Sequence, residues 1–260
     1  MIFPKISKGR MQWIASLRQK KKRTEEGVFV AEGSKCVLDT LKHFELVAVV
    51  ATEEWLFQHS TIIEQICDQI IAASRSEMER MTSLSTAPDV IAVYKTPAFS
   101  IEEWSRGIDS RLSLVLDGIQ DPGNLGTIIR TADWFGVHHI IASPDTVDAF
   151  NTKTVQATMG AISRLNIVYT DLYAFLDSFP QLTKYGTLLN GENIYKSHLK
   201  QTGLIIFGNE GKGISQKIRE KIDRPLLIPS FPENAATSES LNVGVATAIT
   251  LAEFRRRTFN

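Results

Sequence analysis

Residues 114–132 read LVLDGIQDPGNLGTIIRTA. The apolar residues before Asp117 predict a buried strand, and the Pro-Gly pair that follows indicates a turn. A helix is expected to begin near Asn124, because asparagine is a favourable N-cap residue. The apolar residues after it share one helical stripe, whereas Arg130 lies off that stripe. We therefore expect Asn124 and Arg130 to project from a helix at the carboxyl end of a strand, where they could meet a ligand. An N-cap and a solvated arginine are the structural alternative.

A second strand-like run leads into a glycine-rich loop, and residues 204–215 read LIIFGNEGKGIS. Its three glycines allow the main chain to bend sharply and to approach a ligand closely. A P-loop is excluded, because Gly208 is too close to the Gly-Lys pair at 211–212 and Gly213 follows the lysine. A dinucleotide fingerprint is excluded too, since its glycines occur in the opposite order. Glu210 would repel phosphates, so the loop suits a cationic or hydroxyl-bearing ligand.

A third stretch begins with a strand that ends at Pro229 and closes with a long helix. A polar loop covers residues 230–239, and Ser240 is expected to open the helix, which reads SLNVGVATAITLAEFRRR to residue 257. Its small residues would let another main chain pack closely against it. A tight core contact is the structural explanation for these residues, and a solvated helix end explains the three arginines.

Strand-like and helical stretches alternate along the second half of the chain. Strands are expected at residues 112–116, 139–142, 166–169, 187–190, 204–207 and 226–228. This alternation predicts an α/β fold with a mostly parallel sheet and helices on both of its faces. Ligands of such sheets bind beyond the carboxyl ends of the strands, where the three stretches place their polar residues.

The apolar periodicity lapses between residues 95 and 111, where proline, glycine and charged residues interrupt it. This lapse predicts a linker at residues 99–111 between two domains. Residues 1–98 are expected to form a small α/β module, and residues 112–260 the second domain. In the module, strands are expected at 28–31, 46–51 and 90–94, and helices at 36–44 and 61–73.

The composition excludes several classes of protein. The chain has 260 residues, and its 29 basic and 29 acidic residues cancel, so any nucleic-acid binding must be local. Residues 1–35 carry nine lysines and arginines against three glutamates, which is a local excess of six positive charges. Cys36 and Cys67 lack metal-ligand spacing, so we expect no metal site and no disulfide framework. No apolar run approaches the ~18 residues of a membrane span. We expect a soluble cytoplasmic protein without membrane contact.

The three stretches, taken in this order, resemble the signature motifs of the SpoU (TrmH) family of RNA 2′-O-methyltransferases, within the wider SPOUT class. The resemblance covers residues 112–257. Residues 20–41, with Arg23, Phe29 and the Glu-Gly pair at 32–33, look like the RNA-binding module that precedes the catalytic domain in many members. The resemblance implies a homodimer and a carboxyl-terminal segment that is threaded through a loop as a deep trefoil knot. The loop at 230–239 is longer than in typical members.

The resemblance also implies roles for single residues. It implies a pocket for S-adenosylmethionine that is held largely by main-chain groups at Gly208, Ile228 and Leu241. Substrate and catalytic roles fall on Asn124, Arg130, Glu210, Ser240 and Asn242. The implied reaction transfers a methyl group to a ribose 2′-hydroxyl of a structured RNA and needs no metal.

Several alternatives stay open. The family proposal makes Arg130 the general base, but a guanidinium normally stays charged, so Arg130 could instead grip a phosphate and stabilise the developing alkoxide. The accessory module favours ribosomal RNA over transfer RNA as the substrate. Two other classes remain: a non-catalytic RNA-binding or assembly protein on the same fold, and a nucleotide-dependent oxidoreductase on an ordinary doubly wound sheet.

Overall fold

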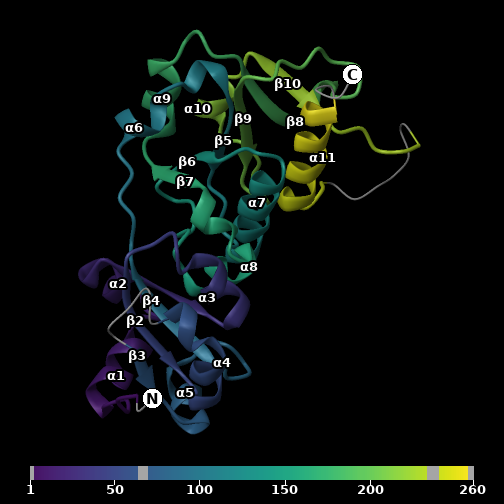
Figure 1. Cartoon of the computed structure of the whole chain (residues 1–260). Coiled ribbons are helices and arrows are strands. Elements are labelled where there is room, and N and C mark those ends of the chain that lie inside the picture. Colours follow the sequence, from purple (N-terminus) through teal and green to yellow (C-terminus); the bar gives the residue numbers. More distant parts are fainter. Residues whose placement is uncertain (1–2, 64–69, 233–239, 257–260) are drawn as a thin grey trace. The chain divides into compact units, whose positions relative to one another are not determined.

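A computed structural model describes residues 3–63, 70–232 and 240–256 (Figure 1). By its internal contacts the chain divides into two compact units. Unit 1 comprises Met1–Ala98 and Asp148–Ser163, and unit 2 comprises Phe99–Val147 and Arg164–Asn260. The second stretch of unit 1 therefore lies inside the range that the sequence assigns to the second domain. Cys67 and most of the long loop expected at 230–239 lie outside the described residues.

Unit 1 is built on a sheet with the strand order β1-β4-β2-β3. Its strands are β1 (Val28–Glu32), β2 (Leu46–Ala51), β3 (Ile70–Ala72) and β4 (Val90–Lys95). β4 pairs antiparallel with β1 and β2, whereas β3 pairs parallel with β2. The helices of this unit are α1 (Lys8–Ser16), α2 (Lys20–Glu26), α3 (Ser34–Thr40), α4 (Glu53–Ile63), α5 (Arg75–Met81) and α8 (Thr152–Thr158).

The three strands expected in the module are confirmed, but the helix expected over residues 61–73 is wrong at its carboxyl end. Residues 70–72 form β3, whose register partners in β2 are Val49, Val50 and Ala51. Ile70 and Ala72 are buried in this arrangement. A short apolar run cannot be assigned to helix or strand from its periodicity alone, and tertiary pairing decided the outcome.

Two residues that the resemblance singled out in the module hold its sequence-distant parts together. Arg23 is 4% exposed, and its Nη2 donates a hydrogen bond to the Asp148 carboxylate at 2.7 Å. Phe29 is fully buried, and its ring lies 4.7 Å from the ring of Phe150, measured between centroids. These contacts explain why residues 148–163 belong to unit 1.

The Glu-Gly pair at 32–33 ends β1 and begins the next helix. Glu32 is 3% exposed, and its Oε1 accepts hydrogen bonds from the main-chain N–H of Ser83 at 3.1 Å and from the Ser83 hydroxyl at 2.7 Å. Gly33 has a φ of 87°, which lies in the left-handed region that favours glycine. The pair therefore has a structural role at the end of the strand.

Unit 2 is built on a parallel sheet with the strand order β10-β8-β9-β5-β6-β7. Its strands are β5 (Leu112–Asp117), β6 (His139–Ala142), β7 (Asn166–Tyr169), β8 (Lys184–Asn193), β9 (Gly203–Gly208) and β10 (Arg224–Leu227). Its helices are α6 (Ile101–Ser105), α7 (Pro122–Trp134), α9 (Leu172–Ser178), α10 (Gln216–Arg219) and α11 (Val243–Arg256). A short 3-10 turn lies at Ile108–Ser110, and a second one, Ala161–Arg164, spans the boundary between the sequence ranges of the two units.

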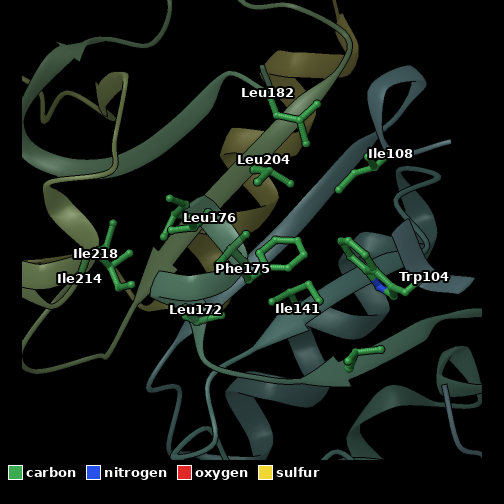
Figure 2. Close-up of a cluster of buried hydrophobic side chains, with 13 residues drawn as sticks. Trp104, Ile108, Ile141, Leu172, Phe175, Leu176, Leu182, Leu204, Ile214 and Ile218 are labelled. Carbon is green, nitrogen blue, oxygen red and sulfur yellow. The ribbon is translucent and has the colours of Figure 1, made fainter. Parts of the chain in front are cut away.

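Helices cover both faces of this sheet. Residues of α6, α9 and α10 form a buried cluster on one face, and Phe175 of α9 and Leu204 of β9 both belong to it (Figure 2). Successive residues of a strand point to opposite faces, so Ile205 and its register partner Tyr185 face the other side. There α7 packs against α11, and Phe254 of α11 meets the Tyr185 ring edge-on at a centroid distance of 5.0 Å. The predicted α/β class, with a mostly parallel sheet between two layers of helices, is confirmed.

Two helix starts differ from the sequence prediction. α7 begins at Pro122 rather than near Asn124, because the Asp121 carboxylate accepts a hydrogen bond from the Asn124 N–H and acts as the N-cap. α11 begins at Val243 rather than at Ser240. Asn124 therefore lies in the first turn of α7, and Ser240 lies three residues before the first residue of α11.

β8 and β10 approach each other closely at Gly191. A Cβ atom at this position would lie 2.6 Å from the main-chain atoms of Leu226, so only glycine fits. The trefoil knot that the resemblance implies stays a prediction. Within the residues that the structure describes, no helix combines the length and apolar character needed to cross a membrane.

Candidate active site

The loops that follow β5 and β9 lie side by side at the carboxyl edge of the unit 2 sheet. β5 and β9 are parallel neighbours, and Asp117 at the end of β5 is the register partner of Gly208 at the end of β9. The Asp117 carboxylate accepts a hydrogen bond of 2.7 Å from the main-chain N–H of Ser215. This contact ties the end of the glycine-rich loop to the first strand.

Three of the predicted site residues form one chain of hydrogen bonds. Asn124 Nδ2 donates to Glu210 Oε1 at 2.9 Å, and Asn242 Nδ2 donates to Asn124 Oδ1 at 2.8 Å. Each residue comes from a different loop or helix start, and Asn124 and Asn242 are 118 positions apart. The fold therefore brings together side chains that the sequence could only place at three separate strand ends.

Asn242 is also fixed by the helix that it precedes. Its Oδ1 accepts hydrogen bonds from the main-chain N–H groups of Gly244 at 2.9 Å and Val245 at 3.3 Å. These donors belong to the first turn of α11 and have no partner within the helix. The side chain of Asn242 thus satisfies the helix end with its oxygen and holds Asn124 with its nitrogen.

Arg130 and Ser240 lie outside this chain of hydrogen bonds. Arg130 is exposed on the third turn of α7, and its guanidinium has no hydrogen-bond or ion-pair partner among the described residues. Ser240 is exposed and lines the cavity described next. Both side chains are available to a bound molecule.

A cavity of about 320 Å³ opens beside the network. Gly208, Ile228 and Leu241, which the resemblance assigns to the cofactor, all line it, and so do Glu210 and Ser240. The remaining lining residues come from 187–189, 207–219, 226–227 and 243–246. The cavity is therefore built from the second and third stretches of the sequence analysis.

The cavity wall includes a close approach of two main-chain segments. A Cβ atom on Gly208 would lie 2.2 Å from the main-chain carbon of Gly213 and 2.2 Å from the nitrogen of Ile214. The main-chain N–H groups of Ile228 and Leu241 have no partner among the described residues, so they are free to hydrogen-bond to a ligand. Bare main chain with free donors fits the kind of pocket that the resemblance implies.

Asn209, which was not among the predicted site residues, organises the glycine-rich loop. Its Oδ1 accepts hydrogen bonds from the main-chain N–H groups of Gly211 and Lys212, both at 3.0 Å. Its Nδ2 donates to the main-chain oxygen of Gly118 at 2.8 Å and so joins the loops that follow β9 and β5. The signal was the tendency of asparagine in loops to bond to the main chain two residues later.

His139 has a structural role outside the site. Burial lowers the pKa of His139 to about 4, helped by the positive charge of Arg111 and by His138. His139 is therefore neutral near pH 7, and its ring meets Trp104 edge-on at a centroid distance of 5.7 Å. Within the described ranges, no group of His, Cys, Asp and Glu side chains is arranged to hold a metal ion.

Two stretches of the chain match known families. Residues 111–252 match the SpoU rRNA Methylase family, and residues 8–92 match the MRM3-like substrate binding domain. The first match contains all eight residues to which the resemblance assigns roles in the site. The second match lies within unit 1.

Individual proteins are similar to the chain over nearly its whole length. It is 31% identical over 242 residues to the 23S rRNA (guanosine(2553)-2′-O)-methyltransferase RlmP of Bacillus subtilis (strain 168), covering 92% of this chain and 93% of that protein. A solved TrmH-family structure from Porphyromonas gingivalis has a TM-score of 0.85 at 33% identity, over 97% of this chain and 99% of that chain. An AdoMet-bound rRNA methyltransferase from Sinorhizobium meliloti has a TM-score of 0.84 at 27% identity, over 98% and 97% of the two chains.

Proposed function

The chain belongs to the SpoU rRNA methylase family, and from this membership we propose that it transfers a methyl group from S-adenosylmethionine to a ribose 2′-hydroxyl of ribosomal RNA. The observation that carries the proposal is the hydrogen-bonded chain of Glu210, Asn124 and Asn242 beside a cavity lined by Gly208, Ile228 and Leu241. A polar cluster next to a main-chain cavity can hold a sugar hydroxyl beside a bound methyl donor.

The residues that line the cavity fit S-adenosylmethionine. We assign the main-chain groups of Gly208, Ile228 and Leu241 to this cofactor, because the two free N–H donors and the bare surface of the glycine suit a ligand that is recognised by main chain. When bound, the cofactor supplies an electrophilic methyl group on its sulfonium sulfur. Alignment of the incoming hydroxyl by the surrounding side chains would contribute about 7 kcal/mol or more of the barrier reduction.

Asn124 is the residue that we assign to the ribose. An asparagine amide has two N–H donors and two acceptor lone pairs, and Glu210 and Asn242 each occupy one of these positions. One donor and one lone pair therefore remain for a hydroxyl group. Glu210 and Asn242 fix the rotation of the amide, and Ser240 at the cavity wall can add a further hydroxyl contact.

Arg130 is the residue that we assign to the RNA backbone. Its guanidinium is exposed and unpaired within the described chain, and its planar donors match a phosphate group. In this role Arg130 holds the phosphate next to the target ribose and stabilises negative charge that develops on the 2′-oxygen. The hydroxyl proton then leaves to the phosphate or to water, which avoids the need for a deprotonated guanidinium.

Unit 1 is the part that we assign to RNA selection. Residues 8–92 match a substrate binding domain, and the local charge excess of residues 1–35 is carried mostly by exposed side chains such as Lys8, Lys20 and Lys21. Positive side chains bind RNA through its phosphates. Because ribosomal RNA is a cytoplasmic substrate in bacteria, we also assign the protein to the cytoplasm.

We further propose that two copies of the chain associate through α7 and α11. Trp134 of α7 is 84% exposed and Val245 of α11 is 48% exposed, although the two helices pack against each other. We take these two exposed apolar side chains on neighbouring helices as the place where the copies meet. Light scattering during size-exclusion chromatography should give twice the mass of the chain, and a Trp134→Glu variant should elute as a monomer.

Substitution of Arg130 separates the chemical step from cofactor binding. For Arg130→Ala we expect methyl transfer to ribosomal RNA to fall at least about 100-fold, since one charge-stabilising donor has this effect in other enzymes. Affinity for S-adenosylmethionine, measured by calorimetry, should stay unchanged. Arg106→Ala, which removes an exposed arginine beyond α6 on the opposite face of the sheet, is the matched control and should leave both quantities intact. Equal losses of transfer and of cofactor affinity in Arg130→Ala would contradict the assignment.

A further inference from the structure

The cavity of unit 2 carries an excess of positive charge. The charged side chains among its lining residues are Glu210, Lys212 and Arg219. Both carboxylate oxygens of Glu210 are already engaged, Oε1 by Asn124 and Oε2 by the main-chain N–H of Gln120 at 3.5 Å. Lys212 and Arg219 form no ion pair with any described residue. Glu210 keeps its negative charge, so these three side chains give the cavity a net charge of +1, with neither cation in an ion pair among the described residues.

Arg219 is held in a fixed orientation at the cavity wall. It is the last residue of α10, and its Nε donates a hydrogen bond of 2.8 Å to the main-chain oxygen of Ile214. Its Nη2 lies against the bare Cα of Gly213, where a Cβ atom would be only 3.2 Å away. Gly213 has a φ of 69°, so its conformation also favours glycine. Main chain thus fixes one edge of the guanidinium and leaves the Nη groups for a ligand.

The apolar and charged parts of the cavity come from different segments. Most apolar side chains are supplied by residues 187–189, 226–228 and 241–246, whereas all the charged side chains are supplied by residues 210–219, a stretch that adds only Ile214 to the apolar lining. A ligand with an aromatic ring system and a charged end would match this division. S-adenosylmethionine has both, since its amino-acid portion ends in a carboxylate.

We propose that the Arg219 guanidinium binds the α-carboxylate of the amino-acid portion of S-adenosylmethionine. A guanidinium presents two parallel N–H donors that match the two oxygens of a carboxylate, and such charge-assisted pairs are stronger than neutral hydrogen bonds. Lys212 presents a single ammonium group by comparison, and its main-chain N–H, not its side chain, donates the hydrogen bond to Asn209. The assignment rests on the proposed function, since it presumes that this cofactor occupies the cavity.

The test compares two ligands that differ in the carboxylate. Calorimetry would measure the dissociation constants of S-adenosylmethionine and of decarboxylated S-adenosylmethionine for the whole protein and for an Arg219→Gln variant. The unaltered protein should bind the decarboxylated ligand at least about tenfold more weakly. Arg219→Gln should lose about tenfold in affinity for S-adenosylmethionine and almost nothing for the decarboxylated ligand.

Two further variants complete the design. Lys217→Gln is the matched control, because Lys217 lies on the same helix with its Nζ 4.4 Å from the ring centroid of Tyr173, and it should behave like the unaltered protein. Arg219→Lys keeps the charge without the planar pair of donors, and should show an intermediate preference. If Arg219→Gln does not fold, the test compares the unaltered protein with Arg219→Lys. A smaller preference for the carboxylate-bearing ligand in Arg219→Lys supports the inference, and an equal preference contradicts it.

The outcomes separate this inference from the proposed function. Equal affinities of the unaltered protein for the two ligands would overturn the inference while leaving the cofactor assignment intact. Equal losses for both ligands in Arg219→Gln would also overturn it, because they would show that Arg219 only supports the loop. Binding of neither ligand by the unaltered protein would overturn the proposed function, and the inference with it.

Discussion

Gly208 is the position at which a single added carbon should have the largest effect on the site. Its Cβ would lie 2.2 Å from main-chain atoms of Gly213 and Ile214, and main chain cannot move aside as a flexible side chain can. For Gly208→Ala we therefore expect the glycine-rich loop to shift and affinity for S-adenosylmethionine to fall about tenfold or more in calorimetry.

Gly211→Ala is the matched control, because the nearest atom to a Cβ there is the Asn209 side-chain oxygen at 3.7 Å, an ordinary contact. This variant should bind the cofactor almost normally. Normal cofactor affinity in Gly208→Ala would show that the close approach of main chain does not shape the cavity.

At the scale of single residues, the sequence predicted which side chains belong to the site, but it did not predict which of them are hydrogen-bonded to each other. Residue type and position after a strand were enough to identify several site residues. These are the glycines of residues 208–213, Asn124 and Glu210. The sequence could not predict the hydrogen bond between Asn124 and Asn242, since it joins residues 118 positions apart and depends on the path of the chain. Asn209 was overlooked because hydrogen bonds to main chain leave no spacing pattern in a sequence.

The crossing of α7 and α11 depends on one small residue. A Cβ atom on Gly244 would lie 2.8 Å from Thr127 Cγ2, so the two helices pack closely at this point. Gly244→Val should push them apart and lower the free energy of unfolding by about 1–3 kcal/mol, measured by denaturant titration. Replacing Thr127 by alanine in the same chain should recover part of this loss, because it removes the methyl group that clashes.

Additive effects of the two substitutions would contradict this account of the crossing. Asn242 precedes α11 and holds Asn124, which belongs to α7. We therefore also expect Gly244→Val to reduce methyl transfer, since it moves the two asparagines relative to each other.

At the scale of elements, the sequence predicted the strands more reliably than the helix ends. Buried strands such as β5 and β9 are short apolar runs with clear boundaries, and they were found at nearly their observed positions. The start of α7 was misplaced by two residues, because Asp121 and Asn124 are both favourable N-cap residues and the sequence alone does not rank them. β3 was taken for part of a helix because its pairing with β2 is a tertiary effect.

The pair of Arg23 and Asp148 joins parts of unit 1 that lie 125 positions apart. Arg23 is 4% exposed, so removal of the carboxylate would leave a buried charge without its partner. Asp148→Asn should lower the free energy of unfolding by roughly 3 kcal/mol, measured by denaturant titration.

The exposed pair of Lys221 and Asp177 provides the control for this prediction. The Asp177 side chain is 49% exposed, and Asp177→Asn should cost less than about 1 kcal/mol. Similar losses of unfolding free energy in the two variants would show that the ion pair of Arg23 and Asp148 stabilises the fold no more than a surface ion pair does.

Stability should also depend on pH through His139. Burial lowers its pKa to about 4, whereas an unfolded histidine titrates near 6.5. Between these two pKa values, His139 therefore binds a proton in the unfolded state but stays neutral in the folded state. The contribution of His139 to stability is complete above pH 6.5 and is lost as the pH falls towards 4. Denaturant titrations at pH 7, 5.5 and 4.5 should show this decline, and His139→Gln should reduce it, whereas replacement of the exposed His198 by glutamine should not.

At the scale of the whole chain, the sequence could not predict that residues 148–163 belong to unit 1. Their apolar side chains fit the alternation of the second half, and nothing in the pattern shows that Phe150 packs against Phe29. Pattern reasoning follows the order of the chain, whereas compact units form wherever apolar surfaces meet. A fragment that lacks residues 1–98 would expose these side chains, so such fragments are poor tests of the catalytic unit.

The central claim is that the cavity beside Glu210, Asn124 and Asn242 delivers a methyl group to a ribose oxygen of ribosomal RNA. The most direct measurement is mass spectrometry of nucleosides, after incubation of the protein with ribosomal RNA and S-adenosylmethionine that carries an isotopically labelled methyl group. We predict that the label appears in one 2′-O-methylnucleoside, and that it is absent with the Arg130→Ala variant. Label on a nucleobase, or no label in any nucleoside, would contradict the claim.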